Sequence, residues 1–375
     1  MEGDPEAIRT AISNAEAELA NEGATKESLS TAYNALNEAK DAIKLTLNMP
    51  QAGMWLRITA AAHGTMLSAK PVESPANRMA FIDEADGSTV FYFDGSTLTS
   101  LDRGLAVTGR DAGKAGVEGV TYSFEESALT PGKYCIRFNP DGSSNRFLWA
   151  WDSSKGYADQ NGVDNANCAF ILENVKQLPL TMTEQAGGRY LAAISLPTSV
   201  ATVSGAKVEN VFMQDGKAVY EHSNAEGIPA NTGVLLAGDS PVATLVLGDC
   251  EEGPDNNALQ PLLQSSADFT EGLILSSPEG TVGFWEPQIV TIYGDEEQGT
   301  EDQDTKPVRG FTAYLDIATA GANGVELVES TNGIENIEHG TLNMENGAVY
   351  NLQGQRVNKA QKGVFIQNGK KVVVK

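Results

Sequence analysis

Apolar residues recur with two different periods along the chain. Between residues 4 and 46 they lie three or four positions apart in two runs that Gly23 separates, which is the spacing of amphipathic helices. The segment 4–6, Asp-Pro-Glu, and Thr25 supply the capping side chains and first-turn proline that helix starts favour. From residue 50 onward the period shortens to two, which is typical of strands with one buried face. The pattern predicts a helical hairpin followed by a mainly β chain.

Three copies of one unit follow between Gly53 and Val175. Each copy opens with an apolar strand, continues through a turn and a paired strand, and closes with a strand centred on phenylalanine. The openings are residues 55–58, 90–93 and 134–138, and the closings are residues 79–83, 122–125 and 168–173. Three repeats of about forty residues indicate a threefold barrel. The segment resembles the ricin-type β-trefoil, which implies sugar binding, but all three closings lack the Q-x-W signature of those lectins.

Residues 178–328 form a second β-rich region whose strands break at fixed turns. The clearest strands are residues 191–197 and 227–236, the second of which contains Ile-Pro-Ala-Asn-Thr-Gly-Val-Leu-Leu. Residues 282–285 and 313–315 add two more. The region is similar to an uncharacterised β-sandwich module that recurs near the C-termini of secreted and surface proteins of Gram-negative gut and oral anaerobes. That resemblance implies a location outside the cell and no particular function.

The tail from Gly333 onward has a basic balance and a compact β pattern. Six basic residues stand against three acids, and alternating runs occupy residues 348–352, 363–366 and 371–374, with an Asn-Gly hairpin turn before the last. The tail resembles the C-terminal sorting domains that address cargo to the type IX secretion machinery. The resemblance implies export, and an ordinary terminal β-domain is the alternative.

The chain is therefore expected to have four parts. The helical hairpin at residues 1–49 resembles the short spacer repeats of bacterial surface proteins (FIVAR-like). A β-trefoil-like module at 50–176, a β-sandwich-like module at 177–330 and a small C-terminal β sorting-like domain at 331–375 follow. Two helices bury one stripe against each other and little more. We therefore expect the hairpin either to pack on a neighbour or to continue an upstream helical bundle, and we expect a further domain upstream of this chain.

Charge and hydropathy exclude several classes of partner. The 26 basic and 50 acidic residues give a formal charge of -24 and a pI near 4.4, which repels phosphate backbones and anionic lipid surfaces. No apolar run approaches the roughly 18 residues of a membrane span, and the start lacks the basic and apolar regions of a signal peptide. We predict no nucleic-acid partner, no transmembrane segment, and a secreted or cell-surface chain whose export signal lies upstream.

The side chains that usually carry catalysis form no motif. The three histidines are His63, His222 and His339, and the three cysteines are Cys135, Cys168 and Cys250. No C-x-x-C pair, zinc-protease motif or serine-nucleophile elbow is present, although Cys135 and Cys168 could pair if their strands are neighbours. The acidic run at residues 295–304 favours a solvated loop over a metal site. We predict no catalytic residues, no metal and no cofactor.

One strand of the third repeat carries the candidate binding surface. Phe147, Trp149 and Trp151 alternate along it and project to one face, where aromatic planes can stack on sugar rings. A loop rich in acids and amides follows, although its Gly162 does not stand where the calcium-hand template needs glycine. The candidate glycan-binding residues are Trp149, Trp151, Asp152, Asp159, Asn161, Asp164 and Asn167. An aromatic row is also what a buried core would contain.

These patterns predict a non-catalytic accessory region of a secreted or cell-surface protein. Glycans are the candidate ligand, and the export machinery is the expected partner of residues 331–375. The first alternative is a structural stalk that presents an upstream domain, in which case the candidate tryptophans are buried. The second is an unrecognised hydrolase, which would need a cleft with convergent acids and perturbed pKa values.

Overall fold

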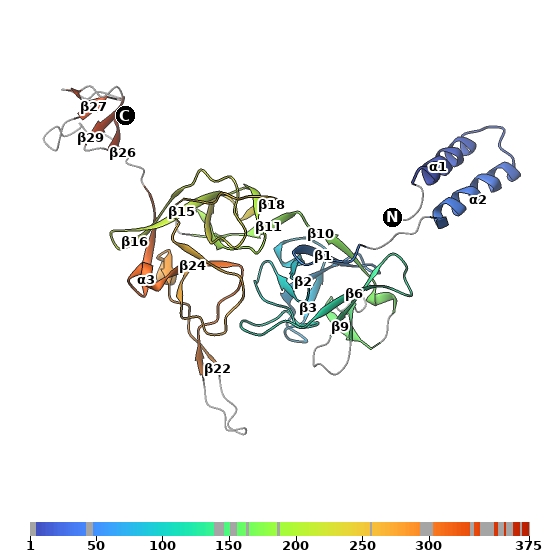
Figure 1. The fold of residues 1–375 in the computed structure, drawn as a ribbon, viewed down its shortest axis with the longest axis horizontal. Coiled ribbons are helices and arrows are strands. Elements are labelled where there is room, and N and C mark those ends of the chain that lie inside the picture. Colours follow the sequence, from blue (N-terminus) through green and yellow to red (C-terminus); the bar gives the residue numbers. More distant parts are fainter. Residues whose placement is uncertain are drawn as a thin grey trace, which may run out of the picture. The chain divides into compact units, whose positions relative to one another are not determined.

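The chain is mainly β, as its alternating pattern predicts (Figure 1). The computed structural model describes residues 5–42, 48–138, 146–150, 156–162, 165–185, 188–255, 257–292, 303–330, 334–337, 349–351, 356–357, 363–367 and 370–374. These residues divide into two compact units. Unit 1 spans Met1–Leu101, Ala106–Lys114 and Glu118–Val175, and unit 2 comprises Asp102–Leu105, Ala115–Val117 and Lys176–Lys375.

A helical hairpin begins unit 1. Helices α1 (Pro5–Leu19) and α2 (Lys26–Ala42) lie side by side (Figure 1). A capping box starts α2, because the Ser28 amide donates to the Thr25 hydroxyl at 3.1 Å and the Thr25 amide donates to the Ser28 hydroxyl at 3.0 Å. The predicted cap at Asp4 lies outside the described residues. Large apolar side chains exposed on the two helices are Ile12, Leu19, Leu29 and Tyr33.

Ten strands make the sheet of unit 1. They are β1 (Met54–Ala60), β2 (Met66–Pro71), β3 (Met79–Ile82), β4 (Val90–Phe93), β5 (Leu98–Ser100), β6 (Tyr122–Glu126), β7 (Tyr134–Phe138), β8 (Arg146–Ala150), β9 (Ala158–Asn161) and β10 (Phe170–Asn174). Two 3-10 turns, η1 (Gly87–Thr89) and η2 (Ala166–Cys168), precede β4 and β10. The predicted openings coincide with β1, β4 and β7, and the predicted closings with β3, β6 and β10.

The sheet of unit 1 closes into a barrel-like arrangement. Seven strands follow the order β3-β2-β1-β10-β7-β8-β9, and Tyr157, next to β9, pairs with Ala80 in β3. The Phe81 amide donates to the Gly156 carbonyl at 2.7 Å beside that bridge. Off this path, β4 pairs with β1 and β5, and β6 pairs with β7. The two ends of the seven-strand path are therefore joined.

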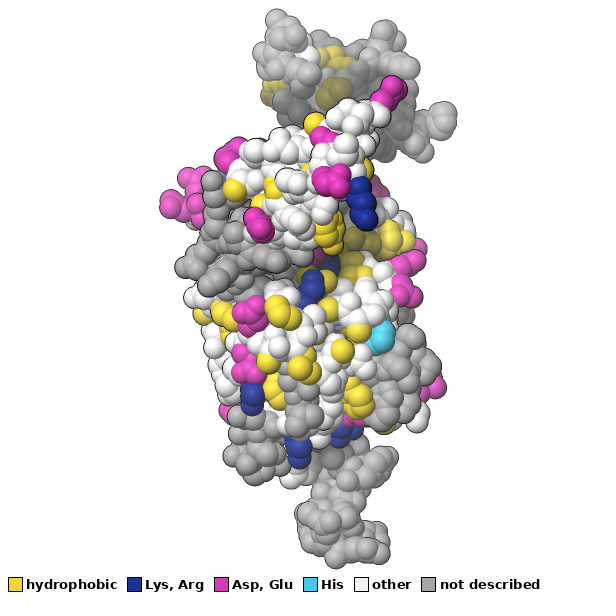
Figure 2. Space-filling model, turned by 90° about the vertical axis from the view of Figure 1, so that its right-hand side faces the viewer, with side chains coloured by type: hydrophobic (Ala, Val, Ile, Leu, Met, Phe, Trp, Pro, Cys, Tyr) yellow, Lys and Arg dark blue, Asp and Glu magenta, His cyan; other side chains and the backbone are white. Residues whose placement is uncertain are grey.

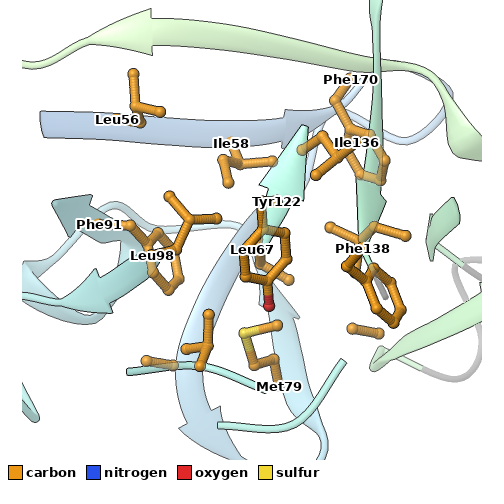
Figure 3. Packing of buried hydrophobic residues seen from close by; sticks show 14 of the residues in the cluster. Leu56, Ile58, Leu67, Met79, Phe91, Leu98, Tyr122, Ile136, Phe138 and Phe170 are labelled. Carbon is orange, nitrogen blue, oxygen red and sulfur yellow. The ribbon is translucent and has the colours of Figure 1, made fainter. Parts of the chain in front are cut away.

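One apolar core fills unit 1. Inward-facing side chains from β1, β2, β4, β5, β6, β7 and β10 meet there (Figure 3). Tyr122 lies among them, and its hydroxyl donates to the Gly109 carbonyl at 2.9 Å, which satisfies the one polar group that this ring brings into the core.

Unit 2 contains most of the remaining strands. They are β11 (Gln177–Thr181), β12 (Thr183–Glu184), β13 (Tyr190–Ile194), β14 (Val200–Ser204), β15 (Lys207–Gln214), β16 (Lys217–His222), β17 (Val234–Gly238), β18 (Val242–Leu247), β19 (Leu259–Leu262), β20 (Gly272–Ser276), β21 (Gly283–Trp285), β22 (Val290–Ile292), β23 (Gln303–Thr305), β24 (Thr312–Asp316) and β25 (Gly324–Glu329). A 3-10 turn, η3 (Pro278–Gly280), and a short helix, α3 (Ile317–Ala320), complete the set.

The main sheet of unit 2 also closes on itself. Its order is β12-β13-β17-β15-β16-β25-β21-β20-β24-β19, and an additional pairing joins β13 to β24. At that junction the Ser195 hydroxyl donates to the Thr312 carbonyl at 2.7 Å, and the Thr312 hydroxyl donates to the Ala193 carbonyl at 3.1 Å. Strands β11, β18 and β14 form a separate three-stranded sheet, and β22 pairs with β23. The closed sheet holds a second apolar core that includes Phe284 and Leu315.

The C-terminal residues form a small sheet of their own. Its strands are β26 (Ile334–Ile337), β27 (Val349–Asn351), β28 (Arg356–Val357), β29 (Gly363–Gln367) and β30 (Lys370–Val374), in the order β26-β30-β29-β27-β28. The three β runs predicted for the tail correspond to β27, β29 and β30.

Surface charge and helix hydropathy bear on the predicted partners. On the face shown in Figure 2, lysine and arginine side chains are scattered among acidic ones and do not gather into a basic patch. Within the described part of the chain, no helix is both long enough and apolar enough to cross a membrane.

Candidate functional site

The predicted aromatic row lies on β8, and its two described rings share a face. Leu148 and Ala150 belong to the main core of unit 1, so the alternating Phe147 and Trp149 point to the other side of the sheet. Phe147 is buried with Cys135 and Cys168, and the half-buried Trp149 packs against this small cluster. The predicted Trp151 and Asp152 lie outside the described residues. Of the two described rings in the row, Phe147 is buried and Trp149 is partly exposed.

An arginine holds Phe147 in place. The Arg137 guanidinium carbon lies 4.3 Å from the centre of the Phe147 ring, and its Nε donates to the Glu125 carboxylate at 2.8 Å. A guanidinium stacked in this way attracts the ring face and also excludes a ligand from it. Phe147 therefore supports the neighbouring tryptophan and is not itself a platform for a sugar.

The polar candidates lie on β9 and in η2. Asp159 is directly opposite Trp149 across the β8–β9 ladder, and Asn161 is opposite Phe147. Asn167 lies in η2, where its backbone amide donates to the side-chain oxygen of Asn165 at 2.9 Å. The predicted Asp164 lies outside the described residues. The structure thus pairs Trp149 with Asp159 in register, and β9 also carries Asn161.

Asp159 is an ion-paired residue. Its carboxylate accepts a hydrogen bond from the Arg110 guanidinium, and both side chains are largely buried. The pair fixes the carboxylate beside Trp149 with one oxygen already engaged. Trp149, which is partly exposed, is thus bordered by carboxylate and amide groups that can bind hydroxyl groups.

Unit 2 contains a second polar surface, which we call the charged layer. On each of five neighbouring strands, one side chain faces the core of unit 2. The residue two positions further along the same face of each strand is charged or ionisable. The core and layer residues are Leu191 and Arg189 at β13, Ala237 and Asp239 at β17, Val211 and Glu209 on β15, Tyr220 and His222 on β16, and Leu327 and Glu329 on β25. Because β13 and β15 begin where β17, β16 and β25 end, these side chains meet at one end of the sheet.

The charged layer surrounds a pocket of about 440 Å³. Arg189 is central to it: its Nε lies 3.9 Å from an Asp239 oxygen, and its Nη1 lies 3.8 Å from a Glu329 oxygen. The Tyr220 hydroxyl donates to the other Glu329 oxygen at 3.4 Å. These contacts are too long to be strong hydrogen bonds, so the groups surround the pocket more than they bind one another.

Glu209 is the most buried member of the charged layer. It is 3 % exposed, and its neighbours across the sheet are His222 on β16 and Leu235 on β17. Burial raises its pKa to about 7, and the Glu329 carboxylate adds to this, while Arg189 and Lys207 oppose it. Burial and the same Glu329 carboxylate raise the pKa of Tyr220 to about 12. Near neutral pH Glu209 therefore exchanges between a carboxylic acid and a carboxylate.

The charged layer was missed at the sequence level because its signal is distributed over five strands. Each strand contributes one or two polar residues next to an apolar one, which is an ordinary pattern for a strand end. The acidic run that did attract attention, at residues 295–304, is described only at Gln303 and Asp304, where the Thr291 hydroxyl donates to the Asp304 carboxylate at 2.7 Å. No group of three or more potential metal ligands occurs among the described residues.

Comparison with known proteins found no protein-family model and no curated protein that matches this chain.

Proposed function

We propose that the chain is a non-catalytic accessory region of a secreted or cell-surface protein, and that unit 1 carries a β-trefoil-like module that binds glycans. The half-buried Trp149, held beside Asp159 on a rigid strand pair, is the observation that carries the glycan part of the proposal. A tryptophan offers a large apolar face to the C–H face of a sugar ring, and neighbouring acids and amides bind its hydroxyl groups.

The trefoil-like interpretation is supported by positions that correspond between the three repeats. The second strand of each repeat buries one leucine, and each closing begins with a buried side chain. The leucines are Leu67, Leu98 and Leu148, and the closing residues are Met79, Tyr122 and Cys168. Opening strand β1 pairs with the closing strand β10 of the last repeat, which joins the two ends of the module.

The other parts are proposed in the roles that the sequence predicts for them. The exposed apolar residues of α1 and α2 support a spacer that packs on an upstream domain. Residues 177–330 are proposed as a β-sandwich-like module with a structural role, supported by the separate three-stranded sheet β11-β18-β14 that accompanies its main sheet. The small sheet formed by β26–β30 supports a sorting-like domain at residues 331–375. Deletion of residues 331–375 should then abolish export in a host that has type IX secretion, without loss of intracellular protein.

A glycan array with the full chain, with and without calcium, tests the glycan part. Binding is expected for the parent chain and is expected to be lost in Trp149→Ala. Tyr33→Ala is the matched control, because Tyr33 is an exposed aromatic on α2 and belongs to neither β8 nor β9. Circular dichroism confirms that each variant is folded. Binding that persists in a folded Trp149→Ala variant would place the glycan site elsewhere.

If the folded parent chain binds no glycan on the array, the structural stalk would be favoured. Burial of Phe147 and the Arg110–Asp159 ion pair are the observations on that side. Release of new reducing ends during incubation would instead favour the hydrolase, and the charged layer of unit 2 is where its acids would lie.

A further inference from the structure

In the charged layer of unit 2, the Glu209 carboxyl group and the Arg189 Nε have no hydrogen-bond partner among the described residues. Among the described residues, no hydrogen bond reaches the Glu209 carboxyl group, although that residue is 3 % exposed and lines the pocket. The Arg189 Nε is likewise buried without a hydrogen-bond partner there. A buried donor or acceptor without a hydrogen bond costs free energy of folding, so it usually indicates a missing partner. Here one missing partner is a donor for Glu209 and the other is an acceptor for Arg189.

The charges around the pocket limit the class of ligand that it can bind. Two basic side chains face four carboxyl groups around it. The basic residues are Arg189 and Lys207, the acids are Glu209, Glu221, Asp239 and Glu329, and His222 completes the ionisable lining. An excess of acids attracts a ligand with net positive charge and repels an anion. The pocket volume of about 440 Å³ lies within the range of roughly 300 to 1,000 Å³ that small-molecule sites occupy.

We propose that this pocket binds a basic α-amino acid, whose carboxylate accepts from Arg189 and whose ammonium groups donate to Glu209 and the surrounding acids. Such a ligand supplies the missing acceptor and the missing donor at once. Its second positive charge offsets the excess of acids.

Binding is linked to the protonation of Glu209. A ligand ammonium favours the carboxylate form, whereas burial favours the acid with a pKa of about 7. The affinity should therefore rise about tenfold between pH 6 and pH 8, because the ionised fraction of such a group rises by about that factor. Charged and titratable groups that face Glu209 from the neighbouring elements are Arg189, Lys207, Tyr220, Glu221, His222, Asp239 and Glu329.

Isothermal titration calorimetry of the full chain with three probes tests the proposal. L-Lysine carries all three charged groups, cadaverine lacks the carboxylate, and L-norleucine lacks the side-chain ammonium. We expect L-lysine to bind most tightly and each of the other probes at least tenfold more weakly. No binding of L-lysine at millimolar concentration would overturn the proposal, as would equal binding of a neutral sugar.

Variants separate the pocket from general electrostatics. Glu209→Gln and Glu329→Gln each keep the side-chain shape and should weaken L-lysine binding at least tenfold at pH 8. Glu226→Gln, which removes an exposed acid outside the pocket, should leave the affinity unchanged. His222→Asn removes the imidazole facing Glu209 and should retain the pH dependence. Undiminished binding in folded Glu209→Gln, or a pH dependence lost only in His222→Asn, would contradict the assignment.

Discussion

Replacing Glu209 by glutamine should make unit 2 more stable at alkaline pH. The carboxyl group titrates with a pKa of about 7 in the folded chain, against an ordinary value of 4.5. Between these two values the folded state holds a proton that the unfolded state has released. The contribution of Glu209 to stability is therefore fully present below the ordinary value and is lost as the pH rises through about 7. Glutamine cannot ionise, so the variant should not show this loss.

The size of the effect follows from the shift. At about 1.36 kcal/mol per pKa unit, the rise from 4.5 to about 7 corresponds to roughly 3 kcal/mol. Water that enters through the pocket screens the carboxylate and reduces this to about 2 kcal/mol. Glu209→Gln should thus nearly match the parent chain at pH 4, below the ordinary value, and exceed its free energy of unfolding by about 2 kcal/mol at pH 8.

Urea unfolding at the two pH values measures the difference. Hydrogen-exchange mass spectrometry on peptides from β15 and β17 restricts the measurement to unit 2. Titrating groups that do not interact with Glu209 contribute equally to the two proteins, so the comparison isolates Glu209 and the groups coupled to it. Equal pH dependence in both proteins would show that the carboxylate is well solvated in the folded chain. A variant that is less stable at pH 8 would show that the carboxylate is held by a favourable contact.

Two further predictions concern unit 1 and the thiols. Cys250 is partly exposed whereas Cys135 and Cys168 are buried, so Ellman's reagent should modify one thiol in the native chain and all three after unfolding; rapid modification of all three without denaturant would contradict that burial. Tyr122→Phe removes the hydrogen bond to the Gly109 carbonyl and should lower the stability of unit 1 by about 1 kcal/mol in thermal unfolding, while an unchanged transition would mean that water replaces the bond.

Local pattern was sufficient to place most strands. Runs such as Val90–Phe93 and Tyr134–Phe138 were predicted with the same ends as β4 and β7, because alternation and flanking turns are encoded within a few residues. The shared face of Phe147 and Trp149 was also predicted correctly, since it follows from the two-residue period of a strand.

Pairing between distant strands could not be obtained in this way. Arg57 on β1 is joined to Glu173 on β10 by a hydrogen bond at 2.8 Å that spans 116 positions, and no local pattern specifies that partner. The candidate site shows the same limit. Val208 and Glu209 are adjacent and both buried, so alternation alone does not show that the carboxyl group faces the core side of β15. The order in which the strands pair decides whether the charged residue at a strand end faces solvent or lies beside the charged residues of four other strands.

The parallel pairing of β16 with β25 has a consequence during synthesis. Tyr220 and Glu329, which meet in the pocket, leave the ribosome more than a hundred residues apart, and Arg189 emerges before both. A nascent chain therefore cannot offer the pocket until the residues of β25 have been made and have docked beside β16. Any ligand held there reports that β25 has docked beside β16, so occupancy of the pocket distinguishes molecules that have made this contact from those that have not.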